Sequence, residues 1–217
     1  MKTTPAHIVR EYGPFDDKPT VHGVSFDGTQ LWFASGDHLN AVDPASGELR
    51  RALEVQAHAG TAFDGRYLYQ LADDRIQTID PQTGSVLRTI PAPGQGRDSG
   101  MAWAEGTLWV GEYRSRKIHQ IDPETGAILR SIDSDRFVTG VSWVEGELWH
   151  ATWENEESDL RRIDPQSGQV QERLQMPAGV GISGLESDGG ELFYCGGGNS
   201  GKVRAVRRPR AKSRHRQ

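Results

Sequence analysis

The chain has 217 residues, a net charge of −5 and one cysteine, Cys195, which excludes an internal disulfide framework. No apolar run approaches the ~20 residues that a membrane-spanning helix requires, and the N-terminal residues lack the apolar segment of a secretory signal. We therefore expect a cytoplasmic protein that does not associate with membranes.

The charge is unevenly distributed along the chain. Residues 207–217 contain six Arg and Lys residues and no acid, so that residues 1–206 carry a net charge of −11. An acidic body is a poor surface for nucleic acid, because the neutralisation of phosphates needs clustered Lys and Arg. We predict that 207–217 is a basic, disordered tail and that nucleic acid is not a partner.

The first predicted element is a strand over residues 6–12, and five copies of one strand–turn–strand unit follow it. Each copy opens with a glycine, turns at Asp-Gly or Glu-Gly and enters a second strand at a Leu–aromatic pair. The leading glycines are Gly23, Gly60, Gly100, Gly140 and Gly184, separated by 37, 40, 40 and 44 residues. The pairs are Leu31-Trp32, Leu68-Tyr69, Leu108-Trp109, Leu148-Trp149 and Leu192-Phe193. A period of about 40 residues with strand-like patterning is typical of a β-propeller.

Four copies continue into a second kind of turn with the pattern Asp-Pro-x-(Ser/Thr)-Gly. These turns are Asp43–Gly47, Asp80–Gly84, Asp122–Gly126 and Asp164–Gly168. Proline fixes φ near the start of the turn, the aspartate accepts local N–H groups and the glycine accepts a positive φ. The turn therefore separates a third strand from a fourth in each of these copies.

The fifth copy lacks a fourth strand, and the N-terminus supplies a candidate for it. Residues 6–12 resemble the fourth strands that begin near Val86 and Ile128. We predict an all-β fold: a five-bladed β-propeller of four-stranded antiparallel blades, closed by the N-terminal strand, because closure removes exposed edges. The expected domain is 1–206, with blades at about 21–56, 57–96, 97–136, 137–180 and 181–206 plus strand 6–12.

The two rims of such a propeller differ in this sequence. Alternate connections of an antiparallel meander lie at opposite ends of the blade, so the short, uniform turns share one rim. The connections at the other rim vary in sequence and length, as is usual where a rigid scaffold carries a site. The residues before the leading glycines are expected near the channel mouth on this variable rim: His22, Ala59, Ser99, Thr139 and Ser183.

Several polar residues on this rim depart from the repeat. Glu112 ends the second strand of the third copy, where the other copies have Ser, Ala, Thr or Gly, and His150 interrupts an otherwise apolar or neutral position. We expect His22, Glu112 and His150 to be catalytic, with Glu112 also holding a divalent cation such as Mg²⁺ or Ca²⁺. The expected substrate-binding residues are Asp98, Arg114, Trp153 and Tyr194. The alternative is that these are rim residues with structural hydrogen bonds.

The repeat Gly-x-x-x-(Asp/Glu)-Gly-x-Leu-Trp, followed by Ile-Asp-Pro-x-Thr-Gly, resembles the blades of the streptogramin (virginiamycin B) lyase superfamily. It is also similar to the five-bladed glutaminyl cyclases (glutamine cyclotransferase-like), and both resemblances extend over residues 6–206. In the lyases, a histidine before the leading glycine and a glutamate that closes Leu-Trp-x-x-Glu act with magnesium. His22 and Glu112 match these positions, although they lie in different copies here. In the cyclases, an acidic residue occupies the position of Phe33.

These observations favour a small-molecule-binding propeller that acts as a divalent-metal-assisted lyase or hydrolase at the channel mouth. The alternatives are a non-catalytic propeller that binds a protein or saccharide, and a glutaminyl-cyclase-like protein without the usual acidic residue. A single polar cluster at the channel mouth would favour the metal-assisted enzyme. Separate pockets between blades or a broad apolar rim patch would favour the non-catalytic propeller. We expect a monomer or homodimer.

Overall fold

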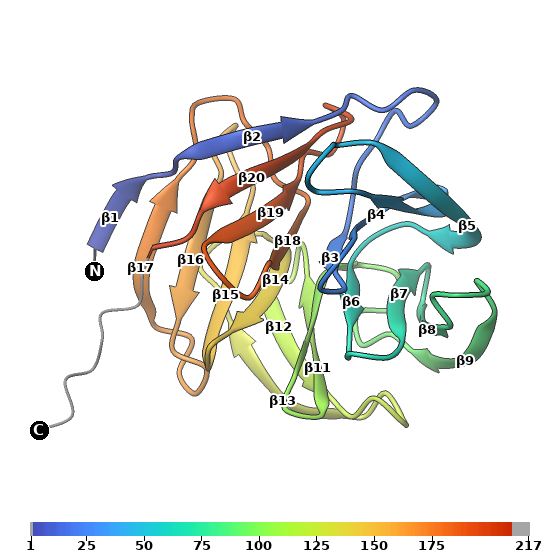
Figure 1. Ribbon diagram of the computed structural model, residues 1–217. Helices are drawn as coiled ribbons and strands as arrows, with labels where there is room; N and C mark the ends of the chain where they lie inside the picture. Colours follow the sequence, from blue (N-terminus) through green and yellow to red (C-terminus); the bar gives the residue numbers. More distant parts are fainter. Residues whose placement is uncertain (1, 210–217) are drawn as a thin grey trace, which may run out of the picture.

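The structure, a computed structural model, describes residues 2–209 as five β-sheets arranged around a central axis, with no helix among them (Figure 1). Blade one contains β3 (Val24–Phe26), β4 (Leu31–Val42) and β5 (Leu49–Ala57), and blade two contains β6 (Thr61–Phe63), β7 (Leu68–Ala72), β8 (Arg75–Ile79) and β9 (Val86–Pro91). Blade three contains β10 (Asp98–Ala104), β11 (Thr107–Glu112), β12 (Lys117–Ile121) and β13 (Ile128–Asp133). Blade four contains β14 (Val138–Val144), β15 (Glu147–Thr152), β16 (Asp159–Ile163) and β17 (Val170–Gln175). Blade five contains β18 (Gly184–Ser187), β19 (Leu192–Gly196), β20 (Val203–Arg207) and the N-terminal β2 (Ile8–Tyr12).

The predicted five-bladed propeller is therefore confirmed. The inner strands β3, β6, β10, β14 and β18 each contact the inner strands of both neighbouring blades, so that they enclose the axis. Blade one differs in detail, because β4 spans the second and third strand positions. Leu31–Phe33 pair with β3, and residues from Gly36 onward pair with β5. The bend between them is contained within one strand at Gly36, which has a φ of 62°.

The N-terminal strand closes the ring as predicted. β2 pairs antiparallel with β20, with Tyr12 opposite Val203 and Glu11 opposite Arg204. Arg204 Nε and Lys202 Nζ each donate to the Glu11 carboxylate at 2.8 Å. A further strand, β1 (Lys2–Pro5), was not predicted: it runs parallel to β17 and covers the outer edge of blade four. Both segments satisfy strand edges that would otherwise present unpaired backbone groups.

The boundary of the predicted basic tail needs a correction. Arg207 is the last residue of β20, and Arg208 is buried. Arg208 donates to the carbonyl oxygen of Gly190 at 2.8 Å and to Glu145 at 2.6 Å, which ties it to blades five and four. Residues 210–217 of the predicted tail lie outside the described residues. Within residues 2–209 there is no helix that could cross a membrane.

The leading glycines of the five repeats pack against one another around the axis. A Cβ atom added to any of them would lie within 2.6 Å of backbone in the next blade. The contacts are Gly23 to Ala59 O at 2.2 Å, Gly60 to Met101 N at 2.6 Å, Gly100 to Gly140 Cα at 2.4 Å, Gly140 to Leu185 N at 2.6 Å and Gly184 to His22 O at 2.4 Å. No side chain fits at these positions, so we refer to them as the glycine ring.

Neighbouring blades are also joined at their outer strands by a repeated arginine. The side chains of four equivalent arginines reach the Asp-Pro turn of the following blade. Arg10 donates to Pro44 O and Ala45 O, Arg51 to Gln82 O, Arg88 to Pro123 O and Arg130 to Gln166 Oε1. Blade four has Glu172 at this position, and blade five has no Asp-Pro turn to receive an arginine. Arg10 thus repeats, at the ring closure, the contact found between the other blades.

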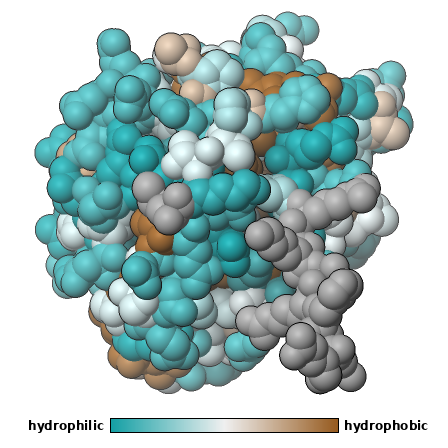
Figure 2. All heavy atoms as spheres, turned by 90° about the vertical axis from the view of Figure 1, so that its left-hand side faces the viewer, coloured by the Kyte–Doolittle hydropathy of each residue, from teal (hydrophilic) through white to brown (hydrophobic). Residues whose placement is uncertain are grey.

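The hydrophobic core lies between adjacent blades, where the Leu–aromatic pairs of the repeat are buried, Leu192 only in part. Trp109 of β11 stacks on Trp143 of β14 at 6.0 Å between ring centroids, which joins blades three and four. Cys195 lies in the same kind of packing, and burial raises the pKa of its thiol to about 12. The face that carries β1 is mostly hydrophilic, with smaller hydrophobic patches (Figure 2).

One acid lies beyond the glycine ring along the axis. Glu186 of β18 occupies the position at which the other inner strands have Ser25, Ala62, Ala102 and Ser142. Its Oε1 accepts hydrogen bonds from Ser142 Oγ at 2.9 Å and from the Ser187 N–H at 2.8 Å. No cation pairs with it among residues 2–209, and burial raises its pKa to about 8. Glu186 is therefore uncharged at neutral pH.

The glycine ring predicts a large difference between two Gly→Ala substitutions. Gly100→Ala would place a methyl group 2.4 Å from Gly140 Cα, whereas Gly181→Ala would meet only Trp153 at an ordinary 3.6 Å. Overpacking of this kind costs about 1–3 kcal/mol or more, so we expect Gly100→Ala to lower the free energy of unfolding by at least that amount in urea titrations. Gly181→Ala should stay near wild type. Equal stability of the two variants would contradict the ring.

Glu186 predicts a pH dependence of stability. Its pKa is raised from 4.5 in the unfolded chain to about 8 in the folded protein. The folded state then holds a proton that the unfolded state releases, so this group's contribution to stability is lost as pH rises between these values. We expect Glu186→Gln to become more stable relative to wild type as pH rises through this interval, in urea titrations at several pH values. The exposed turn variant Glu105→Gln serves as the control, and parallel curves for wild type and Glu186→Gln would refute the prediction.

Candidate functional site

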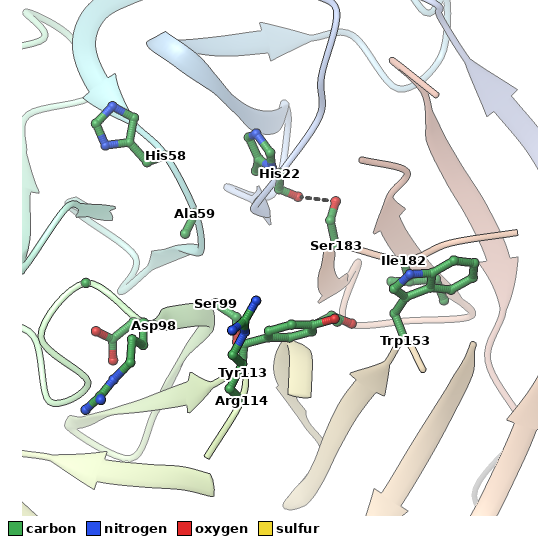
Figure 3. A pocket seen from close by; sticks show the side chains of 13 residues that line it. His22, His58, Ala59, Asp98, Ser99, Tyr113, Arg114, Trp153, Ile182 and Ser183 are labelled. Carbon is green, nitrogen blue, oxygen red and sulfur yellow. Dashed lines mark hydrogen bonds between the residues drawn. The ribbon is translucent and has the colours of Figure 1, made fainter. Parts of the chain in front are cut away.

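A cavity of about 470 Å³ lies over the glycine ring on the variable rim (Figure 3). Its lining includes all five residues that precede the leading glycines: His22, Ala59, Ser99, Thr139 and Ser183. The loops around the mouth add His58, Gly96, Arg97, Asp98, Tyr113, Arg114, Trp153 and Ile182. The glycine ring brings these residues together, because it draws the starts of all five inner strands to the axis.

Two hydroxyl groups of the lining belong to the scaffold. Ser99 Oγ bonds to the carbonyl oxygens of Gly111 at 3.0 Å and Val138 at 2.7 Å, which links blades three and four. Ser183 Oγ bonds to Val21 O at 2.5 Å and accepts from the Gly198 N–H. Thr139 Oγ1, in contrast, is buried without a hydrogen-bond partner among the described residues. The cavity floor is therefore held in place by serines and retains one unused hydroxyl.

Asp98 is the acid of the cavity. It begins β10 opposite Glu112, and a β-bulge follows it before regular pairing resumes at Met101. Its Oδ1 accepts the Gly94 N–H at 2.9 Å, while its buried Oδ2 has no hydrogen-bond partner within residues 2–209. Burial raises the pKa of Asp98 to about 6, and the charge of Glu112 adds to this rise, although the Gly94 hydrogen bond opposes it. The carboxyl group can thus exchange a proton near neutrality.

Glu112, predicted to be catalytic and to hold a metal, lies behind the cavity wall instead of in its lining. Both carboxylate oxygens have hydrogen-bond partners: Ser115 Oγ donates to Oε1, and His119 Nε2 lies 3.1 Å from Oε2. Arg97 Nε, which donates to Gly94 O, also lies 3.1 Å from Oε1 as an ion pair. Burial opposes its ionisation, but the Ser115 and His119 hydrogen bonds and the Arg97 charge outweigh this and lower the pKa of Glu112. Glu112 therefore stays ionised and anchors the residues around it.

The residues present do not fit a divalent cation. Neither oxygen of Glu112 is free of a donor, and no group of three or more His, Cys, Asp or Glu side chains in the described part of the chain is placed to hold a metal. Protein sites for Mg²⁺ and Ca²⁺ supply oxygen ligands, whereas the groups in contact with the Glu112 carboxylate include the cation Arg97 and the imidazole of His119. We derive no step through a metal.

His150 and Tyr194 lie outside the cavity lining, contrary to expectation. His150 is 1% exposed within β15, and burial, assisted by the charge of Arg161, lowers its pKa to about 4. Tyr194 packs in the core between blades five and one, where its ring lies 6.3 Å from Tyr12 and 5.7 Å from Phe26. Both occupy the middle of a second strand, whose side chains enter the packing between strands and not the rim.

His22, in contrast, lines the cavity as predicted. Burial lowers its pKa, and the nearby His58 lowers it further, so that the His22 ring is neutral at pH 7. His58 Nδ1 lies 3.0 Å from Asp73 Oδ1, within ion-pair range though not aligned as a hydrogen bond. Sequence reasoning gave no role to His58, Arg97 or His119; the position of His58 two residues before a leading glycine was the available signal.

The opposite side of the cavity is aromatic and carries Arg114. Figure 3 places Tyr113 and Arg114 between Asp98 on one side and Trp153 with Ile182 on the other. The Tyr113 ring packs on Phe137 at 4.8 Å, which fixes this wall. Arg114 is exposed and has no hydrogen bond or ion pair with any described residue. The predicted residues His22, Asp98, Arg114 and Trp153 therefore share one cavity.

Comparisons with known proteins identify the fold. No protein-family model matches the chain, and no curated protein matches it. The crystal structure of Myxococcus xanthus glutaminyl cyclase superposes with a TM-score of 0.78 at 19% identity, covering 95% of this chain and 97% of the other. The β-propeller domain of Myceliophteria thermophila Cps50 (Swd1) gives 0.61 at 12% identity, covering 94% and 100%. Kuenenia stuttgartiensis hydrazine synthase gives 0.53 at 21% identity, covering 82% of this chain and 56% of the other. The predicted likeness to glutaminyl-cyclase propellers is confirmed at the level of fold.

The donors around Glu112 predict that divalent cations will not stabilise the protein. A ligand that binds only the folded state raises the melting temperature, so Mg²⁺ and Ca²⁺ at millimolar concentrations should leave it unchanged in thermal-shift measurements. Glu112→Gln is the matched variant, because it keeps the shape of the side chain and removes its charge. A rise in the wild type that disappears in Glu112→Gln would show that the carboxylate binds metal.

Proposed function

We propose that the protein binds a small organic molecule in the cavity over the glycine ring and transfers protons to and from it. The observation that carries the proposal is the pair of titratable groups in one lining, His22 and Asp98. Their environments shift the two pKa values in opposite directions: that of His22 is lowered, and that of Asp98 is raised to about 6. Such a pair supplies a neutral base and a protonated acid in the same mildly acidic range.

The unpaired polar atoms support a role in binding as well. Asp98 Oδ2 and Thr139 Oγ1 are buried in the lining and have no partner within residues 2–209. A buried polar atom without a hydrogen bond costs free energy, and a rotation of either side chain that turned its oxygen into the cavity would let a bound molecule remove that cost. The size of the cavity, about 470 Å³, is within the range of small-molecule sites.

The reaction class that fits these groups is elimination or hydrolysis at a C–O bond. His22 would take a proton from the carbon next to that bond, or from a water molecule, and Asp98 would give a proton to the departing oxygen. The protein neither gains nor loses a proton overall. This differs from the metal-assisted reaction expected from the sequence, because the proton donor replaces the cation at the leaving group. A protein that binds its ligand without reaction remains the alternative.

The similarity to a glutaminyl cyclase favours a second, narrower candidate. Cyclisation of a glutaminyl residue releases ammonia and also requires proton transfer, and the two folds correspond over nearly their whole lengths. Phe33, which stands where the cyclases have an acidic residue, is buried and stacks on Phe15 at 4.7 Å. Asp98 would have to supply the acid from another blade. Release of ammonia from a glutaminyl peptide tests this candidate directly.

The proposal predicts that small-molecule ligands depend on His22 and Asp98. A set of small polar compounds is screened by saturation-transfer NMR at pH near 6, where Asp98 is half-protonated. We expect that compounds that bind the wild type do not bind His22→Ala/Asp98→Asn. Binding or turnover by the wild type should weaken above this pH, because Asp98 loses its proton.

The control removes the same residue types elsewhere. His38→Ala/Asp133→Asn changes two residues that are not part of the cavity lining and should retain every compound that binds the wild type. Melting temperatures of both double variants establish that they are folded. Compounds that bind all three proteins alike would overturn the proposal.

A further inference from the structure

The arginines on the variable rim differ in one respect that bears on the ligand. Arg116, Arg136 and Arg161 are each paired with carboxylates, and Arg97 lies 3.1 Å from Glu112. Arg114 has no such partner among residues 2–209, although it lines the cavity. The cavity therefore contains one guanidinium group whose charge and donors are unused by the protein.

The charges around the cavity indicate how many negative charges a ligand would carry. Arg97 lies 3.1 Å from Glu112, whereas no carboxylate among residues 2–209 lies within ion-pair distance of Arg114. A dianion such as a phosphate monoester would add a second negative charge next to Asp98 and Glu112, which already repel each other. A single carboxylate neutralises Arg114 without this excess, and the planar guanidinium matches a carboxylate with two parallel hydrogen bonds.

The wall next to Arg114 indicates that the part of the ligand beyond its carboxylate is aromatic. Tyr113, Trp153 and Ile182 line the cavity on the side away from the two histidines, as Figure 3 shows. Aromatic side chains contribute large contact area and stack on other rings. A ligand that lies on this wall with its carboxylate on Arg114 would present its polar part toward His22 and Asp98.

From these observations we infer that the cavity binds aromatic monocarboxylates, with Arg114 holding the carboxylate and Trp153 the ring. The inference rests on the proposed function in using the same cavity and names the class of molecule that enters it. It assigns the charge selectivity to Arg114, which lies between Asp98 and Trp153 in Figure 3 and is not one of the proposed proton-transfer groups.

The test compares 2-naphthylacetate with its neutral isostere 2-naphthylacetamide, by calorimetry or ligand-observed NMR at neutral pH. We expect the acid to bind the wild type and the amide to bind at least about tenfold more weakly, because only the acid forms the charge-assisted pair. Arg114→Gln should weaken the binding of the acid by a similar factor and leave the binding of the amide unchanged. Arg114→Lys should recover part of the loss, since it restores the charge without the planar fork. Trp153→Ala should weaken the binding of both compounds.

Arg66→Gln is the matched control, because Arg66 also lacks a carboxylate partner in the described chain but packs on Tyr67 outside this cavity. It should bind the acid as the wild type does. Equal binding of acid and amide, equal effects of Arg114→Gln and Arg66→Gln, or no binding of the acid at millimolar concentration would each overturn the inference. If neutral compounds still depend on His22 and Asp98 in that case, the proposed function stands and only the ligand class is wrong.

Discussion

The close approach of five backbone segments around the axis is the constraint on which the rest of the molecule depends. At each leading glycine, the next blade's backbone occupies the space that a Cβ atom would need. The inner strands can therefore converge, and their preceding residues meet as the lining of one cavity. A larger residue at any one of these positions would push two blades apart and open the floor of that cavity. The scaffold and the site thus depend on the same contacts.

The outer part of the ring is held by polar contacts that repeat with the sequence. An arginine on the fourth strand reaches the Asp-Pro turn of the next blade, and Arg10 makes this contact across the junction between the chain's two ends. Blade four departs from the pattern, and its outer edge is where β1 adds a parallel strand, with Lys2 Nζ 3.1 Å from Glu172. The N-terminal segment therefore stabilises two neighbouring blades, through β1 on blade four and β2 on blade five. Because closure is spread over strand pairing and a turn contact, the ring leaves fewer edges exposed.

Two acids placed opposite each other in one strand pair take different roles because their neighbours differ. Glu112 forms hydrogen bonds with Ser115 and His119 and lies beside the charge of Arg97, which together keep it ionised. Asp98 is buried, which raises its pKa, and the negative charge of Glu112 raises it further, although the N–H groups of Gly94 and Gly96 oppose the rise. The acid that stands out in the repeat thus fixes the local charge, while its partner across the strands has the pKa suited to proton transfer. Buried pairs of like charge commonly separate in this way.

The sequence by itself determined the repeat, the number of blades and the closing strand, because turn chemistry and strand periodicity are local properties that recur five times. It also placed the residues before the glycines at the channel mouth, since the register of an inner strand follows from its glycine. Only the tertiary structure showed that Asp98 lines the cavity while Glu112 does not, and that their pKa values differ, because each carboxyl group's state depends on residues such as Arg97 and His119 that approach it through folding. The burial of His150 and Tyr194 outside the cavity lining was hidden from the sequence for the same reason: whether the middle of a second strand faces the rim or the packing between strands depends on where the neighbouring blade lies. Arg114 was visible in the sequence, but its lack of a carboxylate partner among residues 2–209 could be recognised only in the folded chain, where Arg97, Arg116 and Arg136 each lie beside one.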